Sequence, residues 1–296
     1  MELVTRAVLV IAVVLAALIA LSFIGRLHPI GDSFAVFRWY MLVCLALSLT
    51  AAIGLKRRRA ILSAAVLCWA ILAVNHFLAA LADPIGAPLD GDLIYQKNLN
   101  FRLPDVRPIA VDIVATNPGF VTLQEVTERN KELMEQLSEK FPSQHWCPFN
   151  AVGGTAVLSR FPIIEGSQRC AEGGFSAMQV NRRGKPTWIV SLHLHWPWPY
   201  DQRAQLEALS NDLAALDGTI LVGGDFNMVP WSHTMRRLAQ LTGTRIAPGS
   251  GPTFNLRNLI NIQIDHVLVD YCGHATQRPL FGSDHKGVLA RFGNDC

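Results

Sequence analysis

Three long apolar stretches occupy the first eighty or so residues and constrain the fold more than any other feature of the chain. Residues 7–24 and 39–55 contain no charged side chain, and residues 60–82 contain only Asn75 and His76 as strongly polar groups. Each stretch approaches the roughly 20 residues that a helix needs to cross a bilayer. The sequence therefore predicts a membrane module with three transmembrane helices at about these positions.

The basic residues around the apolar stretches predict their orientation. Five basic side chains, Arg6 and the cluster at 56–59, fall on one side of the predicted spans, and Arg26 and Arg38 fall on the other. Because basic residues gather on the cytoplasmic side, we expect the module, residues 1–83, to start in the cytoplasm. The rest of the chain would then face the periplasm or the exterior of a bacterium. A secretory signal would explain the first stretch alone, but no clear small-residue cleavage site follows it and two more apolar stretches do.

Four cysteines fall outside the apolar stretches, namely Cys147, Cys170, Cys272 and Cys296. An even number of cysteines in an oxidising compartment is compatible with disulfides. The short separations favour pairing Cys147 with Cys170 and Cys272 with Cys296. Four buried or free thiols are an equally good interpretation of the same residues.

Residues 91–296 are enough for one domain with its own core and too few for two of comfortable size. They contain 19 Lys and Arg against 19 Asp and Glu, so the net charge of +3 comes entirely from the preceding residues. A protein that binds duplex nucleic acid regardless of sequence usually has a basic face. The bulk composition of these residues shows none.

Strand-like and helix-like patterns alternate through the same residues. Strands are predicted at 93–99, 120–124, 155–159, 175–181, 187–194, 219–222, 264–269 and 287–291, and helices at 105–116, 128–141, 202–216 and 231–241. Mixed sheets with helices on their outer faces pack as a sandwich. The predicted fold class is therefore α/β (α+β), a four-layer helix-sheet-sheet-helix sandwich whose loops at one end are free for chemistry.

A carboxylate and an amide emerge together after the predicted strand 219–222. Asp225 and Asn227 are two residues apart and therefore lie on one face. Their oxygens suit a hard divalent cation, and a carboxylate can also orient or deprotonate water. The pair therefore indicates a metal-assisted hydrolase, although Asp and Asn also form Asx-turns at strand ends without any chemistry.

A second polar string, residues 282–285, precedes the last predicted strand. Asp265 lies on the neighbouring apolar strand, where an unpaired carboxylate is costly to bury, and His285 is its obvious partner. Such a pair would fix the imidazole tautomer and raise its proton affinity. The alternative is a buried hydrogen bond without a catalytic duty. His266 alternates to the other face and is expected to be structural.

Two further polar residues stand at the ends of predicted strands and are candidate ligands for a hard cation. Glu125 follows the strand 120–124, and Asn98 closes the first strand. Taken singly, each would more often be a helix cap or a surface group. Asn100 competes with Asn98 at the next position on the same face.

Two histidines stand at the end of the predicted strand 187–194. We favour His193 as a donor to phosphate oxygens, and His195 as a residue of the substrate rim or merely of the surface. The aromatic and Pro-rich loop 196–200 could form a substrate platform, touch lipid headgroups or simply pack.

Seven short motifs follow one another in the order seen in the endonuclease/exonuclease/phosphatase superfamily. Residues 91–296 resemble this superfamily over essentially their whole length. The motifs are Asn98 and residues 123–126, 154–160, 191–194, 224–227, 264–267 and 283–285. The chain looks most like the bacterial members that carry an N-terminal membrane module. The resemblance implies hydrolysis of phosphate esters with a divalent metal, usually Mg²⁺, with Mn²⁺ as the alternative.

The resemblance also implies the metal ligands. Glu125 would be the main ligand, with Asn98 and Asp284 nearby.

Catalytic roles follow from the same resemblance. Asp225 would orient or deprotonate the attacking water, and Asn227 and His193 would bind phosphate oxygens. His285, supported by Asp265, would stabilise the developing charge or serve as the base, since mechanisms within the superfamily differ on this division.

Two specialised subfamilies do not fit. Abasic-site enzymes commonly read Gln-Glu-Thr-Lys where this chain has residues 124–127, and inositol 5-phosphatases read Trp-Cys-Asp-Arg where it has residues 263–266. The compact domain also leaves limited room for long substrate-recognition insertions.

The leading hypothesis is a membrane-anchored, metal-dependent phosphoesterase that hydrolyses a phosphodiester or a phosphomonoester. Its substrate would be nucleic acid, as for an extracellular nuclease, or a phospholipid headgroup, which the anchor and the lack of net basic charge favour. No obligate protein partner is inferred. The alternative is a catalytically silent tethered module, but such a module should have lost one or more of Glu125, Asp225, Asp284 and His285, and all four are present.

Overall fold

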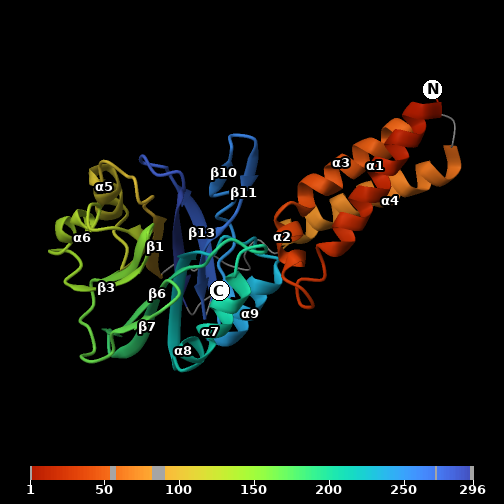
Figure 1. Cartoon of the computed structure of the whole chain (residues 1–296). Helices are drawn as coiled ribbons and strands as arrows, with labels where there is room; N and C mark the ends of the chain where they lie inside the picture. Colours follow the sequence, from red (N-terminus) through yellow and green to blue (C-terminus); the bar gives the residue numbers. More distant parts are fainter. Residues whose placement is uncertain (1, 54–57, 82–90, 271, 294–296) are drawn as a thin grey trace. The chain divides into compact units, whose positions relative to one another are not determined.

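The computed structural model of the chain describes residues 2–53, 58–81, 91–270 and 272–293. Contacts between Cα atoms divide the chain into two compact units (Figure 1). The first unit comprises Met1–Asp83 and Pro197–Pro199, and the second comprises Pro84–Trp196 and Tyr200–Cys296.

The described part of the first unit is helical. Its helices are α1 (Glu2–Leu21), α2 (Ile30–Val36), α3 (Arg38–Ile53) and α4 (Arg58–Leu81). Helix α3 packs against both α1 and α4. Leu42 and Ala46 of α3 are buried with Cys68 and Leu72 of α4. Small side chains such as Ala46 let neighbouring helices approach closely.

The helices of the first unit differ from the sequence prediction in their apolar length. Among the described residues, no single helix has an apolar stretch long enough to cross a bilayer. The bent pair of α2 and α3, with an angle of 67° between them, satisfies the requirement by length and composition only. The other two apolar helical stretches, Arg6–Leu21 and Ile61–Leu72, fall short of the roughly 20 residues required. The described helices therefore do not support the prediction of three transmembrane helices.

The second unit is built on two mixed sheets, the first of which has the strand order β13-β14-β1-β2-β4-β3. Its strands are β1 (Asp92–Asn98), β2 (Phe120–Val126), β3 (Ser143–Asn150), β4 (Gly153–Ser159), β13 (Cys272–Arg278) and β14 (Gly287–Gly293). Strand β1 pairs parallel with β2 and antiparallel with β14. The most C-terminal described strand therefore lies beside the first strand of the unit.

The second sheet has the order β5-β6-β7-β8-β12-β9. Its strands are β5 (Arg169–Ala171), β6 (Phe175–Arg182), β7 (Lys185–His193), β8 (Thr219–Asp225), β9 (Arg245–Ile246) and β12 (Asp265–Val269). Here β7 and β8 form the parallel pair. A separate hairpin joins β10 (Phe254–Leu256) to β11 (Ile260–Ile262).

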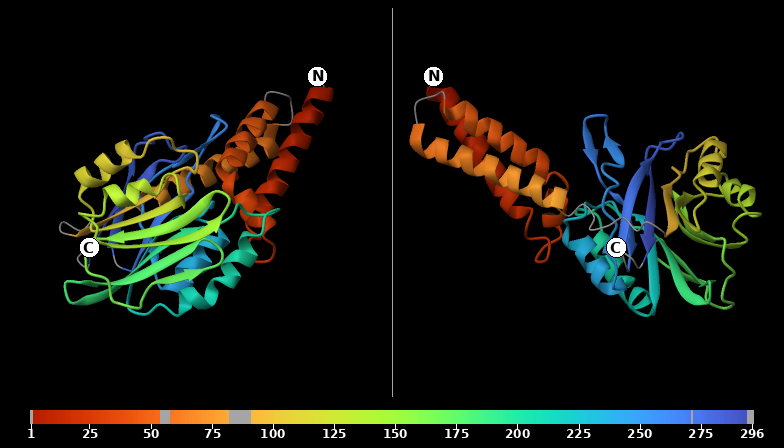
Figure 2. Two further views of the ribbon diagram at one scale, coloured as in Figure 1. Left: turned by 60° about the vertical axis from the view of Figure 1, so that its left-hand side comes forward. Right: turned by 180° about the vertical axis from the view of Figure 1, so that it is seen from behind.

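The two sheets bury one apolar core between them and carry helices on their outer faces (Figure 2). Ile94 and Phe292 of the first sheet meet Ile189 and Leu221 of the second in this core. Helices α5 (Arg107–Thr116) and α6 (Glu132–Gln136) cover the first sheet, and α7 (Gln202–Ala208), α8 (Ser210–Ala214) and α9 (His233–Thr242) lie on the side of the second. The arrangement has the four layers expected from the alternating pattern.

Some elements differ from the sequence prediction. The helix predicted at 128–141 is reduced to α6, because Thr127 and Asn130 exchange side-chain-to-backbone hydrogen bonds that hold the preceding residues in a turn. The helix predicted at 202–216 is divided into α7 and α8. Strand β13 was not predicted, because this outermost strand of its sheet contains few apolar residues.

A disulfide joins Cys147 of β3 to Cys170 of β5, which is the pairing that the sequence favoured and which excludes free thiols at these two positions. It ties an outer strand of the first sheet to an outer strand of the second. The other predicted pair includes Cys296, which lies outside the described residues.

Candidate active site

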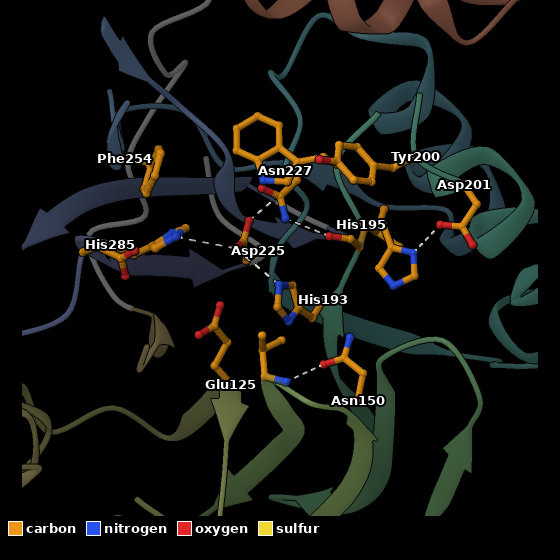
Figure 3. A pocket seen from close by; sticks show the side chains of 14 residues that line it. Glu125, Asn150, His193, His195, Tyr200, Asp201, Asp225, Asn227, Phe254 and His285 are labelled. Atoms are coloured by element: carbon orange, nitrogen blue, oxygen red, sulfur yellow. Dashed lines mark hydrogen bonds and ion pairs between the residues drawn. The ribbon is translucent and has the colours of Figure 1, made fainter. Parts of the chain in front are cut away.

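The residues predicted for the site gather where strand ends of the two sheets meet. Figure 3 shows five of them, namely Glu125, His193, Asp225, Asn227 and His285. Parallel strands β1 and β2 run toward Asn98 and Glu125, and parallel strands β7 and β8 end at His193 and Asp225. Asp265 opens β12 directly opposite Asp225 in antiparallel register. Strand ends from both sheets therefore bring together residues that are far apart in the sequence.

A β-bulge turns Glu125 into the site. The pairing of β2 with β4 shifts register between Gln124 and Val126, and Glu125 itself has a φ of 57°. This left-handed conformation costs a residue with a side chain of order 1–3 kcal/mol, and such strain concentrates at functional positions. Asn130 secures the bulge by donating from Nδ2 to the Glu125 carbonyl at 2.9 Å.

The Glu125 carboxylate accepts two hydrogen bonds, and among the described residues it forms no ion pair with a basic side chain. Asn98 Nδ2 donates to it at 3.1 Å, and the Phe101 backbone N–H donates at 2.7 Å. Burial raises the pKa of Glu125, and the nearby Asp284 carboxylate adds to this effect. Two like charges beside one cavity are an arrangement that a bound cation would stabilise.

Asn98 lies between the two main carboxylates. Its Nδ2 donates to Asp225 Oδ2 at 3.0 Å as well as to Glu125, while its Oδ1 accepts from the Asn100 backbone N–H at 2.9 Å. The amide oxygen therefore uses one of its two lone pairs for Asn100, and the amide nitrogen donates to both carboxylates. The role of Asn98 as a metal ligand stays a prediction.

Asn100, the competing candidate, reaches the other predicted ligand. Its Nδ2 donates to Asp284 Oδ1 at 2.9 Å. Asp284 is exposed and lines the same cavity as Glu125. Asn100 therefore connects the β1 end to the loop that carries Asp284.

Asp225 is the buried centre of the site. Its Oδ2 lies 3.6 Å from His193 Nε2 and 3.8 Å from His285 Nε2. Its Oδ1 accepts from the Asn227 backbone N–H at 3.0 Å. Burial raises the pKa of Asp225 to about 7, although the His285 imidazole acts in the opposite direction. A carboxylate with this pKa can accept a proton near neutral pH.

His285 and Asp265 form the buried pair that the sequence predicted. His285 Nδ1 lies 2.9 Å from Asp265 Oδ2, and Gln96 Nε2 donates to the other carboxylate oxygen at 3.0 Å. Burial lowers the pKa of His285, but the Asp265 and Asp225 carboxylates outweigh it and raise this pKa to about 10. Burial alone would raise the pKa of Asp265, yet the His285 charge and hydrogen bond hold it below its ordinary value.

His193 and Asn227 line the cavity beside Asp225. Burial lowers the pKa of His193 to about 3, so this imidazole is neutral at physiological pH. Its buried Nδ1 has no hydrogen-bond partner among the described residues. Asn227 donates one amide N–H to the Leu194 carbonyl at 2.8 Å, which leaves its second N–H for another acceptor.

These residues surround a cavity of about 430 Å³ with aromatic walls. Trp196, Tyr200 and Phe254 line it together with the carboxylates of Glu125 and Asp225. Among the described residues no Lys or Arg lines this cavity. Its own side chains are therefore poorly suited to neutralise a substrate with many negative charges.

The donor set fits a hard divalent cation. Glu125 and Asp284 supply carboxylate oxygens at the same cavity, and oxygen donors are what Mg²⁺ and Mn²⁺ prefer. Asp225, Asp265 and His285 also bring donor atoms within 4.8 Å of one another, but His285 uses its Nδ1 for Asp265. A third cluster, His145 with Cys147 and Cys170, is not a thiolate site because its sulfurs form the disulfide.

Lys97 is a buried residue that the sequence reasoning missed. Its ammonium donates to the carbonyls of Leu280 at 2.9 Å, His285 at 2.5 Å and Pro279 at 3.3 Å. These carbonyls belong to the loop that carries Asp284. The signal for this residue in the sequence was a lysine within an otherwise apolar strand pattern, since lysine is rarely buried without a partner.

His266 has the structural role expected of it. It is buried, and its Nε2 lies 2.8 Å from the Met228 carbonyl. Burial lowers its pKa to about 4.

Solved structures show the same fold. A beta toxin variant from Staphylococcus aureus with bound magnesium ions is 13% identical, covers 69% of this chain and 100% of its own, and has a TM-score of 0.53. Truncated TDP2 from Caenorhabditis elegans is 17% identical, with 68% and 97% covered and a TM-score of 0.53. An endonuclease/exonuclease/phosphatase family protein from Leptotrichia buccalis is 14% identical, with 68% and 99% covered and a TM-score of 0.55. Among curated proteins, none matches the chain.

Residues 96–285, well over half of the chain, match the family model described as the Endonuclease/Exonuclease/phosphatase family. The matched residues include all eight predicted site residues and every strand of the second sheet. The chain therefore belongs to this family and is a divalent-metal-dependent hydrolase of phosphate esters.

Proposed function

We propose that the chain hydrolyses a phosphodiester by attack of a water that Asp225 activates, with a divalent cation held by Glu125 and Asp284. The observation that carries the proposal is the position of Asp225. It is buried between His193 at 3.6 Å and His285 at 3.8 Å, in a cavity that Glu125 and Asp284 also line.

The proton of the attacking water would pass to Asp225. Water oxygen forms a bond to phosphorus, Asp225 accepts the proton, and the bond from phosphorus to the ester oxygen breaks, which releases an alkoxide that takes up a proton from solvent. A carboxylate is an efficient base near neutral pH when its pKa is close to that pH, which agrees with the raised pKa of Asp225. The cation would supply charge neutralisation at the phosphoryl oxygens.

The three polar side chains around Asp225 would hold the phosphate. His285, kept protonated by Asp265, would place a positive charge beside the developing negative charge. Neutral His193 and the free N–H of Asn227 would act as uncharged donors. Together these groups offset charge in a cavity without a lining Lys or Arg.

The lining of the cavity favours a phospholipid-type headgroup over nucleic acid as the substrate. Nucleic acid binding usually depends on Lys and Arg contacts to several phosphates, and the described cavity lining has none. Aromatic walls from Trp196, Tyr200 and Phe254 suit a substrate with one phosphate and an uncharged or cationic substituent.

We also propose that the first unit anchors the enzyme at a membrane, with the second unit on the outer face. The apolar composition of residues 7–24, 39–55 and 60–82 and the distribution of basic residues support this location. Fusion of a cytoplasm-active and a periplasm-active reporter to the C-terminus tests it. Activity of the cytoplasmic reporter alone would contradict the proposed topology.

The test of the activity compares the wild-type chain with Asp225→Asn on bis(p-nitrophenyl) phosphate in Mg²⁺ or Mn²⁺. Asparagine keeps the shape but cannot take the proton, so turnover should fall by about 10²–10⁴-fold. The exposed Asp217→Asn is the matched control and should keep full activity. Equal rates for Asp225→Asn and the wild type would remove Asp225 from the reaction.

The substrate class is tested on vesicles of zwitterionic phospholipid and on single-stranded and duplex DNA. Faster turnover of the phospholipid supports the preferred class, and faster turnover of DNA makes the enzyme a nuclease. Hydrolysis of none of the diesters with either metal would contradict the proposed function.

A further inference from the structure

A second histidine–aspartate pair stands at the rim of the same cavity. His195 Nδ1 lies 2.5 Å from Asp201 Oδ1, and both residues line the cavity (Figure 3). The side chain of His195 is 35% exposed and that of Asp201 is 71% exposed. We call His195 and Asp201 the rim pair.

The backbone of His195 is held on both sides by buried side chains of α7. The His195 N–H donates to Gln205 Oε1 at 2.7 Å, and Gln202 Nε2 donates to the His195 carbonyl. Gln202 and Gln205 are 2% and 7% exposed. A residue that needed only to face solvent would not require two buried amides to fix its backbone.

The imidazole ring is fixed as well. It stacks on Phe149 with ring centroids 5.3 Å apart and an angle of 18° between the planes. Phe149 also meets the His193 ring edge-on at 6.0 Å. One aromatic side chain therefore sets the position of the rim imidazole relative to the imidazole of the buried site.

The rim pair has the same internal arrangement as the buried pair of His285 and Asp265. In both, the carboxylate takes Nδ1, so Nε2 is the ring nitrogen left to face a ligand. His195 follows His193 by two positions in the chain, so their Cα atoms are at most about 7 Å apart. A group that contacts His195 would therefore be a few bonds away from a phosphate held beside His193.

We propose that His195 binds an oxygen of the organic substituent that stays on the reacting phosphate, and that Asp201 is its positioning residue. A neutral imidazole with Nδ1–H on Asp201 accepts a hydrogen bond from a hydroxyl at Nε2, and the protonated ring donates to an anionic oxygen. The oxygen that His195 binds can belong to a hydroxyl or to a second phosphate, because both make this contact. The inference rests on the proposed function, because it assumes that the reacting phosphate lies beside Asp225.

Ligand binding tests the rim pair without any turnover. Isothermal titration of the full chain in detergent would use methyl phosphate, thymidine 5′-phosphate and thymidine 3′,5′-bisphosphate, with Asp225→Asn as the background to prevent hydrolysis. Methyl phosphate has no oxygen beyond its phosphate group, the second ligand adds hydroxyl and base oxygens, and the third replaces one hydroxyl by a phosphate.

His195→Ala should weaken one or both thymidine ligands by about tenfold, the usual worth of one hydrogen bond, and leave methyl phosphate within twofold. His195→Gln, which keeps a polar amide, should recover part of the loss. Asp201→Asn should weaken the same ligands as His195→Ala does, with a smaller loss of affinity. Asp105→Asn, which removes an exposed carboxylate paired with Arg107, is the matched control and should change no affinity.

A turnover measurement separates binding from chemistry. With methyl p-nitrophenyl phosphate and thymidine 5′-(p-nitrophenyl phosphate), the leaving group is the same, so His195→Ala should raise KM for the thymidine ester and leave kcat for both nearly unchanged. Loss of kcat on both esters would mean that His195 acts at the reacting phosphate and would overturn the proposal.

The outcomes distinguish this inference from the proposed function. If all three ligands bind but His195→Ala weakens none of them, or all equally, the rim pair is structural and the inference fails alone. If no ligand binds but the wild type hydrolyses phospholipid vesicles or bis(p-nitrophenyl) phosphate, the inference fails alone. If the wild type hydrolyses none of the diesters, the proposed function fails and the inference fails with it.

Discussion

Asp225 Oδ2 and His285 Nε2 lie 3.8 Å apart, and the protein raises the pKa of both groups, to about 7 and about 10. The shifts have different causes. Burial makes ionisation of Asp225 unfavourable, whereas two carboxylates outweigh burial at His285. At neutral pH the imidazole is therefore protonated while the carboxylate exchanges protons readily, which is the division of roles expected of a base beside a charge-stabilising group.

The raised pKa of Asp225 predicts a pH-dependent stability in the metal-free protein. The folded state has a pKa of about 7 against an ordinary value of 3.8, so the stabilising contribution is complete below about pH 4 and is lost as the pH rises through 7. Asp225→Asn does not titrate. In EDTA, the variant should therefore gain melting temperature relative to the wild type between pH 5 and pH 8. The gain corresponds to a change of roughly 2–4 kcal/mol in the difference between their free energies of unfolding. A difference that is flat or decreases over this range would contradict the assignment.

Removal of the Asp265 charge should disable His285. In Asp265→Asn the imidazole loses its carboxylate partner, so the pKa of His285 should fall from about 10 toward its ordinary value. Turnover should fall by about 100-fold or more, as in other histidines deprived of their orienting carboxylate. NMR titration of the imidazole and steady-state rates measure the two effects. An unchanged His285 titration in the variant would show that Asp265 does not control this pKa.

Much of the site could be predicted because strand ends are visible in a sequence. Asp225, His193 and Asn98 each close an apolar run, and the alternation of side chains along a strand places them on defined faces. Glu125 was identified for the same reason, but the bulge that turns it inward was not, because a register shift depends on the partner strand.

Other features depend on contacts between residues that are distant in sequence. The contact of Lys97 with the loop carrying Asp284 spans more than 180 positions, and nothing near Lys97 in the sequence indicates it. The rim pair depends on how α7 docks on the end of β7, where Gln202 and Gln205 find the His195 backbone. The short helix α6 reflects the turn formed by Thr127 and Asn130, a local competition that helical periodicity does not reveal.

Lys97 should matter for both stability and activity. Lys97→Met keeps the length of the side chain but leaves the carbonyls of Pro279, Leu280 and His285 without their donor. Of these three residues only His285 is buried, and an unsatisfied buried group costs about 1–3 kcal/mol, so unfolding in urea should show a loss of about this size. Because the same loop carries Asp284, the apparent Mg²⁺ affinity should also weaken. The exposed Lys140→Met is the control and should lie within about 0.5 kcal/mol of the wild type.

The disulfide between Cys147 and Cys170 should stabilise the second unit. It closes a loop with a sequence separation of 23, for which chain entropy predicts about 3 kcal/mol. Cys147→Ser and Cys170→Ser should each lose about this amount in chemical unfolding. The double variant should lose little more than the worse single variant, because both changes break one bond. Additive losses would mean that the two residues stabilise the fold independently.

The chain order of the first sheet has a consequence for biosynthesis. Strand β1 pairs with β2 on one side and with β14 on the other, and Asp284 and His285 lie in the turn before β14. A nascent chain that ends before residue 284 lacks both Asp284 and His285 and has no β14 to pair with β1. We therefore expect ribosome-bound chains to stay inactive until residues 284–293 have been added and β14 has paired with β1.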